Sequence, residues 1–261
     1  MVSIMLPVRT EQDLSRLRRV IAEGEATEIV SEAPRRLALG IGAADRALGG
    51  GLPGAALHEL CAAQPLHFGA ASGFALALAA LAREREKQTL FIATDFACLE
   101  AGAPYGLGLD QFGPGTDRLI VVRVARPVDA LFAMEEALKC RALSAVIAEL
   151  QDEPDLTATR RLSLAARDGG TLGLMLRGKP GDTPSAARTR WWIAAARSTP
   201  DEFGGLGRTA FTLSLVRNRL GPCGQWTVVW DHHEHAFSAL SLGVAAAPRD
   251  GSDREALIRA G

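Results

Sequence analysis

Residues 57–95 carry the pattern in this chain that comes nearest to a phosphate-binding site. The P-loop pattern G-x-x-x-x-G-K-[ST] holds nucleotide phosphates and Mg²⁺ with backbone N–H groups, a lysine ammonium and a hydroxyl. It fits here only with Gly73 as the second glycine. The other diagnostic positions are then held by Phe68 at the first glycine, Phe74 at the lysine and Ala75 at the hydroxyl. Because the groups that phosphoryl transfer needs are missing, we expect a site packed shut around Phe74, with weak nucleotide binding through backbone N–H groups as the alternative.

The elements that must position these residues follow from short apolar runs and their periodicity. A strand over 57–60, a glycine- and alanine-rich turn, a helix after Gly73 and an apolar strand that ends at Asp95 predict a βαβ unit. Further strands are expected at 117–125, 142–150, 171–176, 190–197, 209–218 and 225–231, and helices at 129–140 and 157–170. Before the first strand, Gly49–Gly54 predict a tight connection that depends on glycine.

Length and charge restrict the class of protein. The 261 residues carry a formal net charge of -1, so no global basic field indicates nucleic-acid binding. Four cysteines stand in no CxxC spacing and are typical of small buried side chains in a reducing compartment: Cys61, Cys98, Cys140 and Cys223. The first residues lack the apolar core of a signal peptide, and no run is long enough to span a membrane. We expect a soluble, cytoplasmic protein.

Three segments are predicted along the chain. Residues 1–36 contain an amphipathic helix over 10–24 and a linker, residues 37–242 form the core domain, and residues 243–261 form a flexible tail. The helix either packs on its own domain or lies on a neighbouring molecule, and the sequence leaves both readings open.

Cations gather at two places. The Gly/Pro-rich loop after residue 176 brings together Arg177, Lys179, Arg188 and Arg190. Nucleic-acid affinity follows the number of neutralised phosphates, and aromatic residues supply base stacking. Because no aromatic residue is interleaved with these four cations, a solvated loop is favoured over a DNA-facing one. Arg217 and Arg219 form a second basic pair, whose alternatives are binding a phosphate of another subunit and simple solubility.

The histidines of segment 231–237 do not predict a metal site. A zinc ion needs three or four converging ligands. In a strand His233 and His235 share one face while His232 points away. A polar strand end or a turn is the better interpretation.

The order of these features resembles the core ATPase domain of the RecA family: a short helix with Asp45, the GGGLP turn, the strand HEL, the degenerate P-loop and the strand FIATD. The resemblance implies an α/β, RecA-like core with a mostly parallel central sheet, helices on both faces and a C-terminal antiparallel hairpin. It places Asp95 at the catalytic glutamate, Tyr105 at the tyrosine that stacks on adenine, and Glu149 at the Walker B acid. It also places Arg217 and Arg219 at a basic pair that reaches the nucleotide of the neighbouring protomer, and the loop of four cations at a DNA-binding loop.

A narrower resemblance is to the ImuA family, RecA-like proteins with a decayed P-loop from bacterial mutagenesis cassettes. The segments LGGGLP, ARTRWWIAAARS and LSLVRNR carry it. The resemblance implies a non-catalytic accessory protein of DNA-damage-induced mutagenesis, in translesion synthesis and the SOS response, without a cofactor. Its implied partners are an inactive Y-family polymerase homologue and an error-prone replicative-type polymerase, together with RecA or a second copy of the chain. The alternatives are a cell-division inhibitor similar to SulA and a residual nucleotide-binding switch.

Overall fold

The computed structural model describes residues 6–8, 35–102, 108–109, 112, 115, 117–150, 152–198, 205 and 207–240. The helix predicted at 10–24, Tyr105 and the tail from residue 243 lie outside the described residues. The domain boundaries at 36 and 242 therefore stay predictions.

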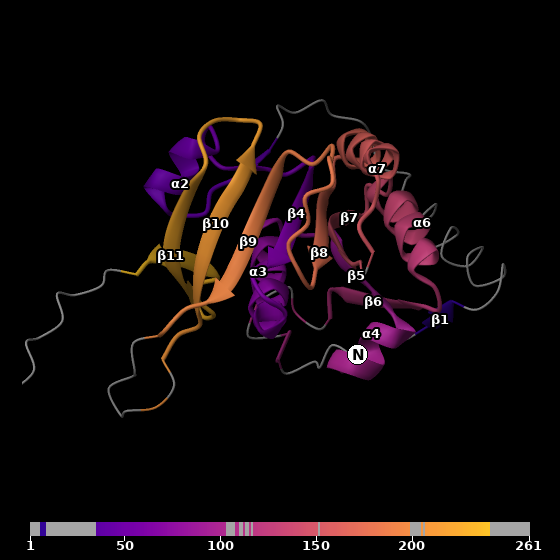
Figure 1. Cartoon of the computed structure of the whole chain (residues 1–261), viewed down its shortest axis with the longest axis horizontal. Helices are drawn as coiled ribbons and strands as arrows, with labels where there is room; N and C mark the ends of the chain where they lie inside the picture. The colour runs from indigo at the N-terminus through magenta and orange to yellow at the C-terminus, as the bar shows by residue number, and fades with distance from the viewer. Residues whose placement is uncertain are drawn as a thin grey trace, which may run out of the picture.

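One ten-stranded sheet organises the described chain (Figure 1). Its strand order is β1-β6-β5-β7-β8-β4-β9-β10-β11-β12. The strands are β1 (Leu6–Val8), β4 (Leu57–Ala62), β5 (Gln88–Thr94), β6 (Leu119–Val124), β7 (Leu143–Glu149), β8 (Leu172–Arg177), β9 (Thr189–Ala195), β10 (Ala210–Asn218), β11 (Gly224–Asp231) and β12 (Ala236–Ala239). Pairing is parallel from β1 through β9 and antiparallel from β9 through β12. The buried strands are apolar runs, as expected for a parallel sheet covered on both faces.

Helices pack on both faces of the parallel half. Helix α3 (Phe68–Leu81) packs on β4, β7, β8 and β9, while α6 (Pro127–Leu138) and α7 (Leu156–Gly169) pack on the other face and on each other. Shorter helices among the described residues include α2 (Gly42–Ala47), the 3-10 turn η1 (Pro65–His67) and α4 (Asp95–Ala101). The predicted α/β class, with a mostly parallel sheet and a C-terminal antiparallel hairpin, is confirmed. Within the described residues, no helix is both long enough and apolar enough to cross a membrane.

The glycine run before β4 has the backbone that its residue type predicts. Gly49, Gly50 and Gly51 have φ values of 69°, 102° and 126°, a region that residues with a Cβ rarely adopt. A Cβ on Gly51 would lie 2.7 Å from the carbonyl oxygen of Leu37. This turn returns the chain through the two-stranded pair β2 (Arg36–Leu37) and β3 (Leu52–Pro53) and delivers it to β4.

The connection between β4 and α3 differs from the predicted glycine-rich turn. Helix α3 begins at Phe68, so Gly69 and Gly73 lie inside the helix, and the connection is the segment 63–67 with η1. Pro65 at the first position of η1 suits the start of a helical turn. Ala70, Ala71 and Ala75 have high helix propensity, which explains why the helix extends through the glycines.

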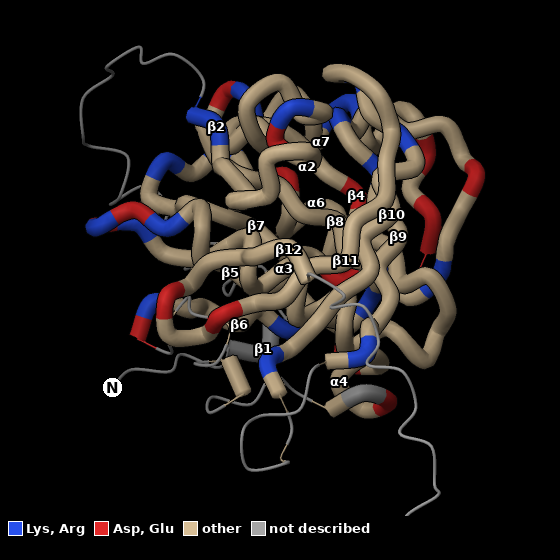
Figure 2. The backbone as a smooth tube through the Cα atoms, turned by 90° about the vertical axis from the view of Figure 1, so that its left-hand side faces the viewer, with Lys and Arg blue, Asp and Glu red and all other residues tan. Residues whose placement is uncertain are grey.

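Charged residues of both signs are interspersed over the fold. Figure 2 shows blue and red segments alternating along the tube rather than separated onto opposite sides. This distribution agrees with the formal net charge of -1.

Candidate functional site

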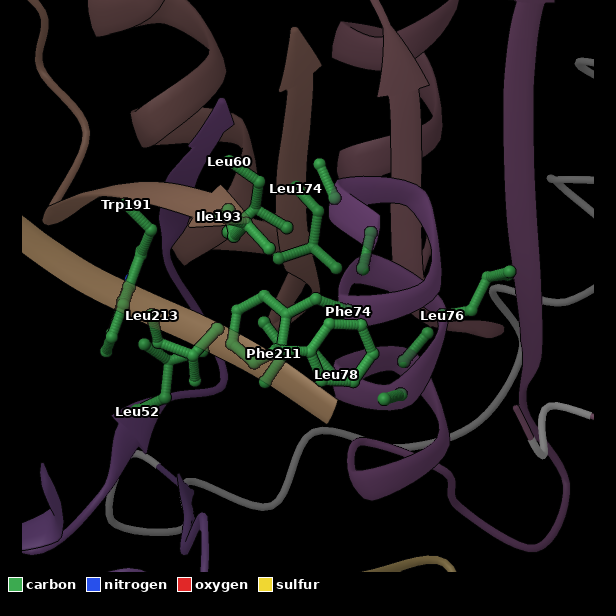
Figure 3. Packing of buried hydrophobic residues seen from close by; sticks show 14 of the residues in the cluster. Leu52, Leu60, Phe74, Leu76, Leu78, Leu174, Trp191, Ile193, Phe211 and Leu213 are labelled. Atoms are coloured by element: carbon green, nitrogen blue, oxygen red, sulfur yellow. The ribbon is translucent and has the colours of Figure 1, made fainter. Parts of the chain in front are cut away.

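The side chain at the lysine position of the P-loop pattern lies in the hydrophobic core. Phe74 is fully buried, and its ring centroid lies 6.0 Å from that of Trp191, 6.0 Å from Phe211 and 5.5 Å from Phe237. Figure 3 shows Phe74 projecting from α3 toward Phe211 and the strands that carry Trp191 and Ile193. Position 74 therefore points away from any ligand on the surface, because the turn of α3 directs it at the sheet.

Gly73 and Ala75, the two neighbours of Phe74 in the pattern, are also in close packing contacts. A Cβ on Gly73 would lie 2.8 Å from Cζ of Phe112, so the missing side chain lets the Phe112 ring rest directly on α3. Ala75 is fully buried. All three positions thus serve the contact between α3 and its surroundings.

A cavity of about 460 Å³ lies at the carboxyl edge of the parallel sheet, where β5, β7 and β8 end. Parallel sheets commonly place their ligand sites at this edge. Its lining residues come from η1, the first residue of α3, α4, the end of β7 and the segment after β8: Pro65, Phe68, Phe96, Ala97, Glu100, Glu149, Leu150, Gly178 and Lys179. Of the predicted site residues, the structure brings Phe68, Glu149 and Lys179 together here.

Asp95 sits at the start of α4 beside this cavity. The Thr94 side chain caps the helix by accepting a hydrogen bond from the backbone N–H of Ala97. One carboxylate oxygen of Asp95 accepts a hydrogen bond from the Arg123 guanidinium at 2.9 Å. The acid that the resemblance to RecA places at the catalytic glutamate is thus paired with a cation from β6.

Glu149 ends β7 as a half-buried carboxyl group. Burial raises its pKa to about 7, and the nearby Glu100 carboxylate adds to the shift. Within the described residues, Glu149 has no hydrogen-bond or ion-pair partner. A cation close to such a carboxyl group stabilises its charged form.

Two of the four cations of the predicted DNA-facing loop are used inside the protein. Arg177 is 3% exposed and donates to Glu153 at 2.9 Å. Arg190 is buried, donates to the carboxylate of Glu59, and also donates to the carbonyl oxygens of Gly181 and Thr183 at 2.8 and 2.7 Å. These contacts fasten segment 178–188, the crossover between β8 and β9, onto the sheet.

The other two cations of that loop are exposed. Lys179 lines the cavity and Arg188 lies at the end of the crossover. The DNA-facing hypothesis for this loop therefore depends on these two side chains, because Arg177 and Arg190 are buried in ion pairs with Glu153 and Glu59.

The basic pair lies at the opposite edge of the sheet from the cavity. Arg217 pairs with Arg190 and Asn218 with Thr189, the first residues of β9. Burial, together with Arg219 and Arg190 nearby, lowers the pKa of Arg217. Arg219 donates to the carbonyl oxygen of Ser185 at 2.9 Å. The pair cannot reach the cavity of its own chain, so a contact with that site requires a second molecule.

Sequence reasoning missed the charged partners inside the sheet. Glu59 and Arg123 are single charges within the apolar strands β4 and β6, and Glu100 and Phe96 lie in α4, which was not predicted. A lone charge in an otherwise apolar strand was the available signal, because a buried charge needs a partner. Its partner depends on strand order, which the sequence does not give.

Comparison with known proteins finds similar proteins in two strains of one bacterial species. No protein-family model matches the chain. The chain is 36% identical over 154 residues to Protein ImuA of Caulobacter vibrioides strain NA1000 / CB15N, and equally to that of strain ATCC 19089 / CIP 103742 / CB 15. The match covers 51% of this chain and 62% of the length of each relative.

Proposed function

We propose that the chain belongs to the ImuA family, whose relatives it matches over 62% of their length, and that it is a non-catalytic, RecA-like accessory protein of DNA-damage-induced mutagenesis. In this role it joins an inactive Y-family polymerase homologue and an error-prone replicative-type polymerase during translesion synthesis in the SOS response. RecA or a second copy of the chain is a further partner in the proposal. The protein contributes surfaces rather than a reaction.

The position of Phe74 carries this proposal. A P-loop ATPase needs a lysine ammonium at the outer phosphates and a hydroxyl on Mg²⁺. Here Phe74 and Ala75 at those positions are fully buried in the core. A lysine and a hydroxyl residue at these two positions would not by themselves create a phosphate-binding site, because both positions are buried and α3 would have to repack.

The acids at the carboxyl edge support the same conclusion. Asp95 is engaged by Arg123, and Glu149 and Glu100 line a cavity with Lys179 as the single lysine among its lining residues. A triphosphate placed there would meet carboxylates with little compensating positive charge. The cavity therefore favours a role other than nucleotide hydrolysis.

The first prediction is that complex formation does not depend on nucleotide. The purified chain is expected to co-purify with the inactive Y-family homologue to the same extent with 1 mM ATP, with ADP, or after apyrase treatment. ATP or ADP at 1 mM is expected to leave its melting temperature unchanged. Measured ATP hydrolysis above buffer, or assembly only with ATP, would contradict the proposal and favour a nucleotide switch.

The second prediction concerns the basic pair. Arg217→Ala combined with Arg219→Ala is expected to weaken self-association and RecA binding at least tenfold, measured by sedimentation and by surface plasmon resonance. The physical reason is the loss of two guanidinium groups near the start of β9, of which Arg217 is half-buried and Arg219 is exposed. A matched control is Arg160→Ala with Arg167→Ala, which removes two exposed arginines from α7. Equal binding by the two double variants would remove this pair from the proposal.

A further inference from the structure

The cavity at the carboxyl edge has predominantly apolar walls with exposed aromatic surface. Phe68 begins α3, and Phe96 on α4 is 54% exposed although its neighbours Ala97 and Leu150 are buried. Leu66 on η1 and Leu99 on α4, from two of the elements that line the cavity, are 76% and 81% exposed. Large apolar side chains gathered around a hollow are typical of a surface that another macromolecule covers.

The charges in this cavity are unbalanced. The Glu100 carboxylate raises the pKa of Glu149, and neither side chain has an ion-pair or hydrogen-bond partner within the described part of the chain. Arg123 pairs with Asp95 at 2.9 Å, and within the described residues no ion pair joins that arginine to Glu149. Lys179 is the single cation among the lining residues, and its side chain is exposed. Cys98 on α4 has a raised pKa and stays a neutral thiol.

This combination selects against two classes of ligand. Phosphates and other anions meet two carboxylates in this cavity, with Lys179 as the one cation among its lining residues. A bound metal ion needs more ligands than two carboxylates offer, and the described residues include no group of three or more His, Cys, Asp or Glu suited to one. A cationic group with an apolar stem would pair with the carboxyl groups and also pack against the apolar walls of the cavity.

Arginine fits the walls better than lysine does. Its planar guanidinium lies flat on an aromatic face and donates several hydrogen bonds to carboxylates in fixed directions. Two phenyl rings and two carboxyl groups line the cavity, and about 460 Å³ is enough for one arginine side chain with the flanking residues of an extended segment.

We propose that this cavity binds an arginine side chain, flanked by large apolar residues, that a partner protein presents. The inference rests on the accessory function proposed above and names the chemical group that one partner supplies. Glu100 and Glu149 receive the guanidinium, Phe68 and Phe96 contact its stem and face, and Leu66 and Leu99 contact the flanking residues. P-loop proteins bind anionic phosphates at this end of the sheet, whereas the proposed ligand of this cavity is a cation.

The test uses the full chain and a fluorescein-labelled twelve-residue peptide with a central Leu-Arg-Leu in a Gly/Ser background. At pH 8 we expect saturable binding by fluorescence anisotropy. Citrulline, a neutral isostere, in place of the arginine is expected to weaken binding at least tenfold. Glu100→Gln with Glu149→Gln in the protein is expected to have the same effect, whereas Glu86→Gln, on an exposed side chain outside the cavity, leaves binding unchanged.

The dependence on pH gives a second readout. Because the pKa of Glu149 is about 7, this group is charged at pH 8 and mostly protonated at pH 6. Binding of the arginine peptide is therefore expected to weaken from pH 8 to pH 6 in the native chain. The same change of pH has a smaller effect on the Glu149→Gln variant.

Three outcomes would overturn the inference: no saturable binding of the arginine peptide up to 1 mM, equal binding of the citrulline peptide, or full binding by the double glutamine variant. Unchanged melting temperatures of the variants exclude loss of fold as the cause of weaker binding. The peptide assay contains no other protein of the mutagenesis pathway. Its failure is therefore distinct from failure of the accessory function, which the co-purification experiment measures.

Discussion

Replacing Phe74 by alanine is expected to lower the free energy of unfolding by about 3–5 kcal/mol, the range found for deleting a buried phenyl ring. The ring is fully enclosed, and three aromatic neighbours from β9, β10 and β12 lose their contact with α3 when it is removed: Trp191, Phe211 and Phe237. Urea denaturation followed by circular dichroism measures the loss. The matched control is Phe96→Ala, which deletes a phenyl ring that is 54% exposed and is expected to cost less than about 1 kcal/mol.

A double variant tests whether restoring the P-loop side chains at positions 74 and 75 is enough to restore ATP binding. Phe74→Lys with Ala75→Ser restores the lysine and hydroxyl of the P-loop, yet we expect it to be less stable than Phe74→Ala and to show no thermal shift with 1 mM ATP. The added ammonium would enter an apolar core, where an unpaired charge is strongly unfavourable. A stable double variant that binds ATP would show that α3 readily turns this face outward, against the core position found for Phe74.

Arg190→Ala is expected to destabilise the protein by about 3–5 kcal/mol, the cost of removing one partner from a buried ion pair. Glu59 is 2% exposed and would remain as an unpaired carboxylate inside the sheet. The same substitution removes the two hydrogen bonds that the guanidinium donates to the backbone of segment 178–188. Urea denaturation measures the stability, and limited proteolysis is expected to show faster cleavage within this segment.

Two controls make this result specific. Arg167→Ala removes an arginine whose ion pair with Asp168 is exposed, and surface pairs of this kind contribute about 1 kcal/mol or less. Glu59→Gln with Arg190→Met removes both charges and is expected to be more stable than Arg190→Ala, because no lone carboxylate remains. If Arg190→Ala were as stable as Arg167→Ala, the crossover would be held by other contacts.

Much of the sheet could be predicted because its strands are short apolar runs between turn residues. The strands at β5, β7 and β10 lie within a residue or two of the ranges expected from the sequence. Trp191 and Trp192 are consecutive residues of β9, and the first is fully buried while the second is 37% exposed. Alternation along a strand is a local property, so one sequence is enough to predict it.

The start of α3 was predicted wrongly for a physical reason. Gly69 and Gly73 suggested a turn, since glycine weakens a helix. In the structure Gly73 is helical, and its missing Cβ admits the Phe112 ring, a long-range contact that no local pattern reveals. A glycine required for close packing and a glycine required for a turn look the same in the sequence.

The candidate site was predictable only in part for a related reason. Glu149 at the end of an apolar strand was visible as a candidate, because an acid there follows a pattern. The pairing of Asp95 with Arg123 and of Glu59 with Arg190 joins residues 28 and 131 positions apart. Such pairs depend on which strands become neighbours, and that order is a property of the whole fold.

The strand order also sets a length. Strands β1 and β12 form the two edges of the ten-stranded sheet, with nine spacings between them. At 4.7–4.9 Å for each spacing, the edges lie about 43 Å apart along a flat path. The sheet is covered by helices on both faces of its parallel half and has little freedom to shorten. It is therefore a rigid spacer, and proteins attached at its two edges would be held apart by roughly the width of a small domain.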